Sequence, residues 1–135
     1  MELFNEVGSL DHLFCGVGGG GLISGCSLVV DAVSPSCKIW GVEPDAAHDA
    51  AISLEQGRVV SIPNQKTIAD GCNTPKIGEN TLIMMKKYIE GIVHVEDPAL
   101  VDWMKFFAER QKLVIEPTGC LGIAGLEKMI EENKI

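Results

Sequence analysis

Apolar runs and amphipathic stretches alternate along the chain. Short apolar runs bounded by turn residues predict buried strands, and apolar residues spaced three and four apart predict helices. This pattern predicts strands over residues 12–17, 37–42 and 92–95, and helices over residues 2–7, 21–33, 46–56, 81–89 and 119–130. Because strands joined through helices pair in parallel, we predict an α/β fold with three αβα layers and a mostly parallel sheet.

A further helix is predicted to begin at Asp97 and Pro98, with Asp97 as its N-cap and Pro98 in its first turn. Its spacing places four apolar side chains on one core-facing side: Leu100, Met104, Phe107 and Ala108. The apolar pair at residues 114–115 is predicted to end a buried strand. In the helix over residues 21–33, Gly25 is expected to allow close packing on the sheet.

Residues 58–80 break this alternation. Two prolines and two glycines punctuate a largely polar stretch: Pro63, Gly71, Pro75 and Gly78. Its first residues, 58–62, have the pattern of a strand. Because long irregular segments in small domains commonly carry function, we expect this segment to lie over a site.

The length and composition fit one folded domain, residues 1–135. The chain has 135 residues, of which 46% are hydrophobic and 22% charged, so it can bury a core. Its formal net charge of -8 argues against nucleic acid as a partner, because nucleic-acid phosphates are bound by clustered Lys and Arg. A phosphate bound to this chain would therefore be held by main-chain N–H groups.

The chain has five cysteines, and no two of them form a Cys-x-x-Cys pair. An odd number of scattered cysteines indicates free thiols in a reducing compartment and gives no zinc or redox motif. The first residues have no signal-peptide pattern, and no apolar run reaches the length that crosses a bilayer. We therefore expect a soluble, cytoplasmic protein without a membrane partner.

The most specific feature is a run of glycines, from Gly18 to Gly21, between the first predicted strand and the helix that follows it. Without side chains, the loop can enter positive φ and turn its N–H groups towards an anion, and the helix N-terminus adds partial positive charge. The run therefore predicts a phosphate site. A plain tight turn is one alternative, and the spacing of Gly16, Gly18 and Gly21 with Glu43 also matches the dinucleotide fingerprint.

A second feature is an acidic stretch at residues 43–49. Its carboxylates and turn carbonyls are the oxygen ligands that Mg²⁺ and Ca²⁺ prefer. Alternatively, Asp45 caps the next helix and the other acids are solvated. Two further polar motifs, residues 67–72 and residues 116–120, are expected to face the crevice where open α/β sheets bind ligands. Each motif alone is also explained by hydrogen bonding within its own loop.

Four segments together resemble one family of enzymes. They are VGGGGLISG, GVEPDAAHDA, TIADGCNTPKIGENT and ERQKLVIEPTGCLG, and they follow one another along nearly the whole chain. These segments resemble the pyridoxal-phosphate enzymes that include threonine and serine dehydratases, serine racemase and threo-3-hydroxyaspartate ammonia-lyase. The resemblance implies pyridoxal phosphate as the cofactor and the fold type II architecture, of which this chain would be part of the large domain.

The resemblance also implies roles for particular residues. The cofactor's phosphate would be held by the main chain of Gly18, Gly19, Gly20, Gly21 and Leu22. Glu116 and Thr118 would line the cofactor pocket, and residues 70–71 would lie near the cofactor ring. A Mg²⁺ or Ca²⁺ site would comprise Glu43, the carbonyl oxygen of Ala47, and Asp49.

Two family segments are absent from this sequence: a Ser-x-Lys-x-Arg-Gly type segment with the Schiff-base lysine, and a Ser-Gly-Gly-Asn type segment whose serine binds the pyridine nitrogen. We therefore assign no catalytic residue and expect a partial ammonia-lyase or racemase that is inactive alone, from a family that acts on small hydroxy-amino acids. The alternatives are a non-catalytic phosphate- or metal-binding module and a dinucleotide-binding domain. An uncovered sheet edge or apolar face is expected to give a homo-oligomer or to recruit a complementary chain.

Overall fold

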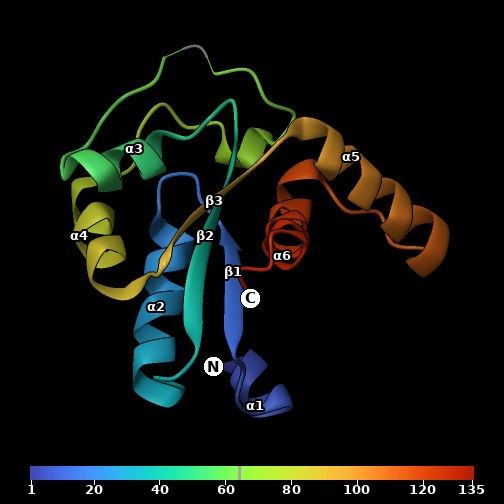
Figure 1. The fold of residues 1–135 in the computed structure, drawn as a ribbon, viewed down its shortest axis with the longest axis horizontal. Coiled ribbons are helices and arrows are strands. Elements are labelled where there is room, and N and C mark those ends of the chain that lie inside the picture. The colour runs from blue at the N-terminus through green and yellow to red at the C-terminus, as the bar shows by residue number, and fades with distance from the viewer. Residues whose placement is uncertain (64) are drawn as a thin grey trace.

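The computed structural model describes residues 1–63 and 65–135. At the centre of this described part is a parallel sheet of three strands, β1, β2 and β3, formed in that order by His12–Gly16, Lys38–Pro44 and Gly91–Val95 (Figure 1). The middle strand, β2, pairs with both neighbours in parallel. The connections between the strands contain helices, which are the usual crossover between parallel strands.

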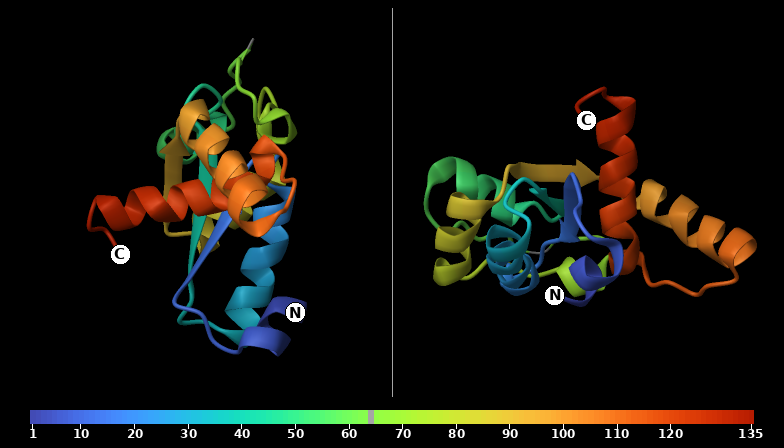
Figure 2. Two further views of the ribbon diagram at one scale, coloured as in Figure 1. Left: turned by 90° about the vertical axis from the view of Figure 1, so that its right-hand side faces the viewer. Right: turned by 90° about the horizontal axis from the view of Figure 1, so that it is seen from below.

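Helices cover both faces of the sheet, which confirms the predicted three-layer αβα fold (Figure 2). One face carries α2 (Gly21–Val33), α3 (Asp49–Gln56) and α4 (Glu79–Tyr88). The other face carries α6 (Leu121–Glu131), which contacts all three strands, and α5 (Asp97–Phe106), which packs against α6.

Shorter helical segments complete the described chain. The helix α1 (Glu2–Val7) precedes β1. Single helical turns of other types lie at Asp70–Cys72, Phe107–Gln111 and Pro117–Cys120. The described residues include no helix both long and apolar enough to cross a membrane, and all five cysteines are free.

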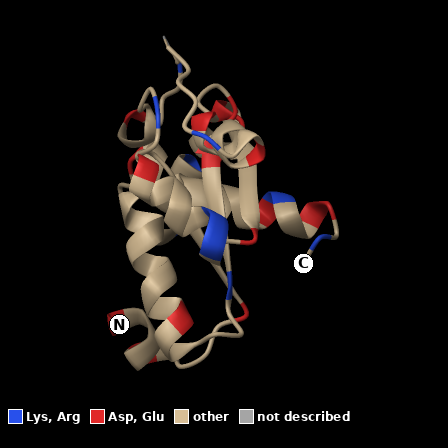
Figure 3. Cartoon of the chain, turned by 90° about the vertical axis from the view of Figure 1, so that its left-hand side faces the viewer, with Lys and Arg blue, Asp and Glu red and all other residues tan. Residues whose placement is uncertain are grey.

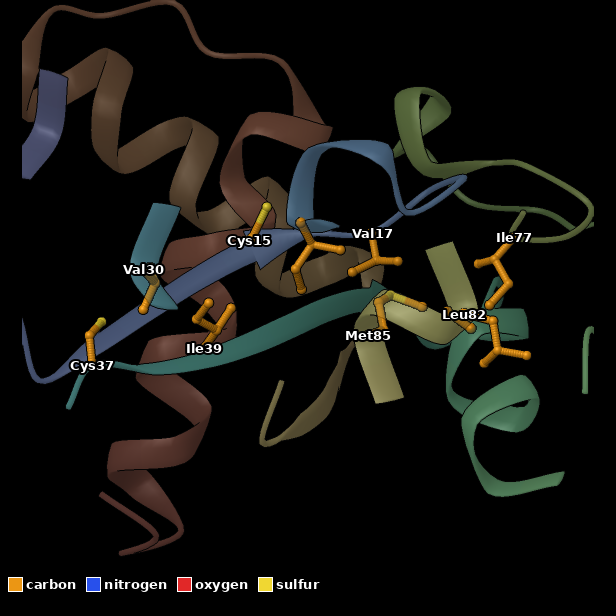
Figure 4. Packing of buried hydrophobic residues seen from close by; sticks show 10 residues of the cluster. Cys15, Val17, Val30, Cys37, Ile39, Ile77, Leu82 and Met85 are labelled. Atoms are coloured by element: carbon orange, nitrogen blue, oxygen red, sulfur yellow. The ribbon is translucent and has the colours of Figure 1, made fainter. Parts of the chain in front are cut away.

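Each face of the sheet has its own buried hydrophobic cluster. The first cluster, against α2, α3 and α4, includes Val17, Ile39 and Met85, and Figure 4 shows these side chains pointing into one layer. The second cluster, under α5 and α6, includes Val42 and Leu121. Ile39 and Val42 are three residues apart on β2, and the alternation of side chains along a strand therefore sends them to opposite faces.

The segment after β2 differs from the prediction. The helix predicted from residue 46 begins only at Asp49, because β2 continues to Pro44 and the chain then turns. The turn is closed by the Ala47 N–H, which donates to the Pro44 carbonyl oxygen at 2.9 Å. Residues 58–62 were predicted to resemble a strand but form none.

The prediction that Asp97 is the N-cap of α5 is wrong. Glu96 holds that position, and Asp97 is the first helical residue. The Asp97 carboxylate instead accepts hydrogen bonds from Thr67 Oγ1 at 2.6 Å and from the Ile68 N–H at 3.0 Å. This side chain therefore fastens the irregular segment to α5, which is a tertiary role that local sequence does not reveal.

The prediction of a buried strand end at residues 114–115 is wrong. The chain leaves α5 through the turn at Phe107–Gln111, and Lys112 then adopts a left-handed conformation with φ 58°. Val114 is 100% exposed and belongs to no strand. The apolar pair therefore lies on a connecting segment, from which the half-buried Ile115 still packs against the second cluster.

The predicted core face of α5 is right at three of its four positions. Leu100 is fully buried, and Met104 and Phe107 pack on the second cluster. Ala108 is exposed; it lies in the turn at Phe107–Gln111 that follows α5.

Gly25 does not face the sheet, contrary to the prediction. It is exposed, and a Cβ at this position would have no heavy atom within 4 Å. The close approach is made on the other face, where a Cβ at Gly125 of α6 would lie 2.6 Å from Val42 Cγ2. Gly125 therefore lets α6 sit directly on β2.

Candidate functional site

A cavity of about 470 Å³ lies where β1 ends and α2 begins. All of the residues predicted to contact the cofactor line it: Gly18, Gly19, Gly20, Gly21, Leu22, Glu116 and Thr118. The fold thus brings the glycine run together with residues from the far end of the chain. The cavity is at the carboxyl end of parallel strands, the edge at which open α/β sheets bind ligands.

The glycine loop presents main-chain N–H groups without protein partners. Gly20, with φ 86°, is the N-cap of α2, and no side chain caps this helix. Within the described residues, no protein acceptor pairs with the N–H groups of Gly18, Gly19, Gly20, Gly21 and Leu22. Unpaired N–H groups and the positive end of the helix dipole both favour an anion at this position.

Two segments approach this loop closely, and one side of it is left open. A Cβ at Gly18 would lie 3.0 Å from the Gly71 carbonyl oxygen, and a Cβ at Gly20 would lie 2.8 Å from the Thr81 side chain. A Cβ at Gly19 or Gly21 would meet no heavy atom within 4 Å. The loop is therefore held by its neighbours while Gly19 and Gly21 border free space.

The turn at Pro117–Cys120 contributes another part of the cavity lining, and it is tied to the irregular segment. Thr118 Oγ1 accepts a hydrogen bond from the Gly71 N–H at 3.0 Å. Gly71 and Cys72 also line the cavity, so part of the segment over residues 58–80 does lie at the site as expected. The same Gly71 N–H also donates to the Asp70 carboxylate, at 3.0 Å. Asp70 itself is exposed and is not among the residues that line the cavity.

The thiols at the cavity are neutral at physiological pH. Burial raises the pKa of Cys15 to about 12, with a smaller contribution from nearby Cys26. Burial likewise raises the pKa of Cys72 to about 11, and the negative charges of Glu43 and Glu116 add to this. Because the thiolate is the reactive form of cysteine, these residues act as apolar lining.

No lysine lines the cavity among the residues that the structure describes. Several lysine amines are instead bound to carbonyl oxygens elsewhere. Lys86 Nζ donates to the Gly57 carbonyl at 3.0 Å, and Lys128 Nζ donates to the His94 carbonyl at 2.8 Å. The described residues therefore bring no lysine amine to the cavity.

The acidic stretch forms a separate, buried site at the end of β2. Glu43 is fully buried, and its carboxylate accepts hydrogen bonds from the Ala50 and Ala51 N–H groups, both at 2.9 Å. Asp49 is 1% exposed, and its Oδ1 accepts a hydrogen bond from Gln65 Nε2 at 3.1 Å. Asp49 Oδ2 is buried without a partner among the described residues.

Both acids are shifted towards their neutral forms. Burial raises the pKa of Glu43 to about 8, against the lowering effect of its two N–H partners and with a further rise from Asp49. Burial also raises the pKa of Asp49. A buried carboxylate oxygen without a donor suits a cation, since hydrogen bonding or a positive charge would offset its desolvation.

The predicted metal ligands Glu43, Ala47 and Asp49 are all buried in this region. In the described part of the chain, no group of three or more His, Cys, Asp and Glu side chains is arranged to hold a metal ion. Two carboxylates with a carbonyl oxygen and water are nevertheless a donor set that Mg²⁺ accepts. The residues present therefore fit a hard divalent cation, and its presence stays a prediction.

Two alternative interpretations, a ribose-binding Glu43 and a helix-capping Asp45, fit the structure poorly. Glu43 is not among the residues that line the cavity, and its carboxylate is bonded to α3, so it is not placed to bind a ribose. Asp45 does not cap α3, because the helix begins at Asp49 with His48 as its N-cap. The acids at Glu43 and Asp49 are buried, not solvated.

Some residues at the cavity were missed by sequence reasoning. Phe14 and Cys15 line it from β1, and Gly122 lines it from the start of α6. The position of Phe14 and Cys15 near the carboxyl end of a predicted strand was the available signal. The contact of Thr81 with the glycine loop had no local signal, because it joins two distant elements.

This structure is a parallel αβα sheet in which a glycine-rich loop joins the carboxyl end of a strand to the start of a helix. The same arrangement is found in α/β domains that bind phosphate-bearing cofactors. Within that class, the chain belongs to the pyridoxal-phosphate-dependent enzyme family: residues 1–135 match the family described as pyridoxal-phosphate dependent enzyme. Its structural neighbours are enzymes of fold type II.

Similar proteins are found among racemases and ammonia-lyases. The serine racemase of Schizosaccharomyces pombe is 46% identical over 133 residues, which cover 98% of this chain and 41% of the racemase. The L-threo-3-hydroxyaspartate ammonia-lyase of Saccharomyces cerevisiae is 50% identical over 124 residues, which cover 92% of this chain and 38% of the lyase. The chain thus spans less than half the length of these relatives.

Solved structures agree with this assignment. The processed form of threonine deaminase isoform 2 from Solanum lycopersicum superposes with a TM-score of 0.94 at 32% identity, over 99% of this chain and 37% of the deaminase. Maize serine racemase superposes with a TM-score of 0.87 at 36% identity, over 92% of this chain and 39% of the racemase.

Proposed function

We propose that this chain holds the phosphate of pyridoxal phosphate as part of an ammonia-lyase or racemase that acts on a small hydroxy-amino acid. One observation carries the proposal: unpaired main-chain N–H groups meet Glu116 and Thr118 around a single cavity. The reaction class is supported by relatives that are named as a serine racemase and a hydroxyaspartate ammonia-lyase.

The chain's own residues would bind and orient the cofactor. The N–H groups of the glycine loop would hold the phosphate, and the dipole of α2 would favour its dianionic form. Glu116 and Thr118 would border the rest of the cofactor. When bound, pyridoxal phosphate supplies an electron-withdrawing ring that stabilises negative charge at the substrate's α carbon.

The chain alone would not turn over substrate. This chemistry needs an amine that holds the aldehyde of the cofactor and moves a proton at the substrate's α carbon. Among the described residues, no lysine lines the cavity. Activity would therefore require a lysine from outside these residues, on a further segment or on a complementary chain.

A divalent cation, Mg²⁺ or Ca²⁺, is proposed for the buried acidic site. Glu43, the Ala47 carbonyl oxygen and Asp49 would be its ligands, with water completing the coordination. The cation would balance two buried carboxylates whose charged forms burial disfavours. It would stabilise the turn between β2 and α3, and it would take no part in the chemistry at the cavity.

Calorimetric titration with pyridoxine phosphate tests the binding proposal. Pyridoxine phosphate has an alcohol in place of the aldehyde, so it does not react with surface lysines, and pyridoxine without the phosphate is the matched control. We expect pyridoxine phosphate to bind and pyridoxine to bind far more weakly. Equal binding of the two ligands, or no binding of either, would refute the phosphate site.

A second measurement tests the need for an external lysine. We expect no ammonia release above background from serine, threonine or L-threo-3-hydroxyaspartate when the chain is supplied with pyridoxal phosphate and Mg²⁺. Sustained turnover by the isolated chain would contradict the proposal. Adding a chain that carries the missing lysine segment is expected to produce activity.

A non-catalytic phosphate- or metal-binding module is the second candidate. The specific observation in its favour is that the described cavity residues include the predicted phosphate contacts but no amine. The titration above would be positive for both candidates. Restored ammonia release on adding the lysine-bearing chain would separate them.

For either candidate we propose a cytoplasmic protein, because its cysteines are free.

A further inference from the structure

Thr81, in the first turn of α4, touches the back of the glycine loop. Its Oγ1 lies 2.9 Å from the Gly19 carbonyl oxygen and 2.9 Å from the Gly78 carbonyl oxygen, so its one proton is shared between two acceptors. The Gly78 N–H also donates to the Gly19 carbonyl, at 3.3 Å. Two donors from the start of α4 therefore point at a single carbonyl group of the loop.

The direction of this carbonyl fixes the direction of a neighbouring N–H group. The Gly19 carbonyl and the Gly20 N–H belong to the same peptide unit, which is planar and trans, since the described chain contains no cis peptide bond. In a trans peptide unit, the C=O and N–H bonds point in opposite directions. The carbonyl points towards α4, and the Gly20 N–H therefore points away from α4, where Gly20 borders the cavity.

The loop cannot set this direction by itself. Glycine populates positive and negative φ about equally, so a peptide unit between two glycines can rotate by half a turn at little cost. The rotated unit would turn the Gly19 oxygen, with its partial negative charge, towards the space that an anion would occupy. The hydrogen bonds from Thr81 and Gly78 favour the orientation that suits an anion.

We infer that Thr81 is a positioning residue that holds the Gly20 N–H towards the phosphate of the bound cofactor. This inference rests on the proposed function, because it assigns a residue to the same phosphate site. Thr81 acts through the main chain: its hydroxyl group binds the far side of the peptide unit and does not reach the ligand. The Thr81 side chain also lies beside Gly20, since a Cβ at Gly20 would be only 2.8 Å from Thr81 Oγ1.

The test compares Thr81→Val, which keeps the shape of the side chain and loses the hydroxyl group, with Thr81→Ser, which keeps the hydroxyl group. Thr81→Val is expected to weaken pyridoxine phosphate binding about ten-fold, as for loss of one hydrogen bond to a charged group. Thr81→Ser is expected to bind like the unmodified chain. Weak binding of pyridoxine itself should not change in either variant, since it lacks the phosphate.

A control variant on the same helix separates this role from a general effect on α4. Lys86→Met removes another hydrogen bond from α4 to a carbonyl, that of Gly57, away from the loop. It is expected to leave pyridoxine phosphate affinity unchanged. If Thr81→Val does not fold, as judged by circular dichroism, Thr81→Ala replaces it, because alanine favours the helix.

Phosphorus NMR gives a readout that a purely structural role would not change. Fewer N–H donors stabilise the dianion less, so the pKa of the bound phosphate should be higher in Thr81→Val than in the unmodified chain. Equal affinity and equal phosphate pKa in folded Thr81→Val and the unmodified chain would overturn the inference alone. Absence of pyridoxine phosphate binding by the unmodified chain would overturn both the inference and the proposed function.

Discussion

Gly19 and Gly20 are adjacent in the loop, but a methyl group would meet different surroundings at each. Gly20 has φ 86°, and its Cβ would lie 2.8 Å from Thr81. We predict that Gly20→Ala lowers the free energy of unfolding by about 2 kcal/mol or more, from left-handed strain and overlap together. Urea unfolding followed by circular dichroism measures this change.

Gly19→Ala is the matched variant. A Cβ at Gly19 meets no heavy atom within 4 Å, and Gly19 does not require positive φ. We predict that its stability stays within about 0.5 kcal/mol of the unmodified chain, as for most substitutions without a clash. Its pyridoxine phosphate affinity should nevertheless fall, because the methyl group enters the space beside the loop. A large loss of stability in Gly19→Ala would show that the loop is packed differently.

Glu43 predicts how stability depends on pH. Burial raises its pKa from 4.5 to about 8, so between these values the folded chain keeps a proton that the unfolded chain has lost. Stability of the metal-free chain should therefore fall as pH rises through this window, by at most about 1.4 kcal/mol per pH unit, and then level off. The measurement is urea unfolding in a chelator at several pH values.

Two controls accompany the pH series. Glu43→Gln cannot ionise, so its profile should be flatter than that of the unmodified chain. Mg²⁺ or Ca²⁺ binds the charged carboxylates, so adding either ion at the upper end of the window should restore stability. A flat profile for the unmodified chain, or no response to either ion, would contradict the proposed buried cation site.

At the scale of single residues, the sequence predicted which side chains would form a site better than it predicted their burial and contacts. The carboxylates at Glu43 and Asp49 were predicted as a pair of cation ligands, and both lie in one buried region. Their burial followed from the packing of α3 on the sheet, which residue type does not reveal. Asp97 was expected to cap its own helix, but Thr67 and Ile68 offered it a tertiary contact.

At the scale of elements, two glycines distinguish the two faces of the sheet. A Cβ at Gly125 of α6 would overlap Val42, whereas a Cβ at Gly25 of α2 has no neighbour within 4 Å. We predict that Gly125→Ala destabilises the fold by about 1–3 kcal/mol, because α6 must move away from β2. Gly25→Ala should stabilise it by about 0.5–1 kcal/mol, because alanine favours the helix. Equal effects at both positions would contradict this assignment of the helix faces.

The success of the element predictions depended on where the local signals were strong. The prediction for residues 21–33 matches α2, because the glycine run and the serine-proline turn mark both of its ends. The start of α3 was wrong because an amphipathic pattern continues through the turn after Pro44. Val114 was predicted to be buried because apolar pairs usually are, but no element of the described fold covers it.

At the scale of the whole molecule, the surface carries apolar side chains that a soluble monomer would rarely expose together. A groove of about 400 Å³ between α1 and α2 is lined largely by apolar residues, Leu22 at 69% exposure among them. On α2, Leu28 is 52% exposed. The strand β1 pairs on one side only, with β2, in the described sheet. Exposed apolar patches and free strand edges both promote association.

We therefore predict that the chain associates, either with a second copy or with a complementary chain. Light scattering at micromolar concentration should give a mass above that of one chain. Leu22→Ser should reduce the association if the groove is the contact, whereas Ile83→Ser, at a similarly exposed side chain of α4, should not. A monomer at these concentrations, in the absence of other chains, would contradict self-association.

The charge distribution is consistent with a small-molecule ligand. The chain has 11 Lys and Arg residues against 19 Asp and Glu residues, and Figure 3 shows the basic residues at isolated places along the ribbon. Nucleic-acid binding depends on clustered positive charge. The proposed phosphate contacts are accordingly main-chain N–H groups, which need no net positive charge.

The sequence by itself determined the fold class, the order of the main elements and the glycine loop, because hydrophobic period and backbone permissiveness are properties of short segments. The tertiary structure alone decided which distant residues meet. Packing of α6 on the sheet brings Glu116 and Thr118 to the glycine loop, and packing of α4 brings Thr81 behind it. Such contacts join residues far apart in the chain, and they depend on the arrangement of all the elements together.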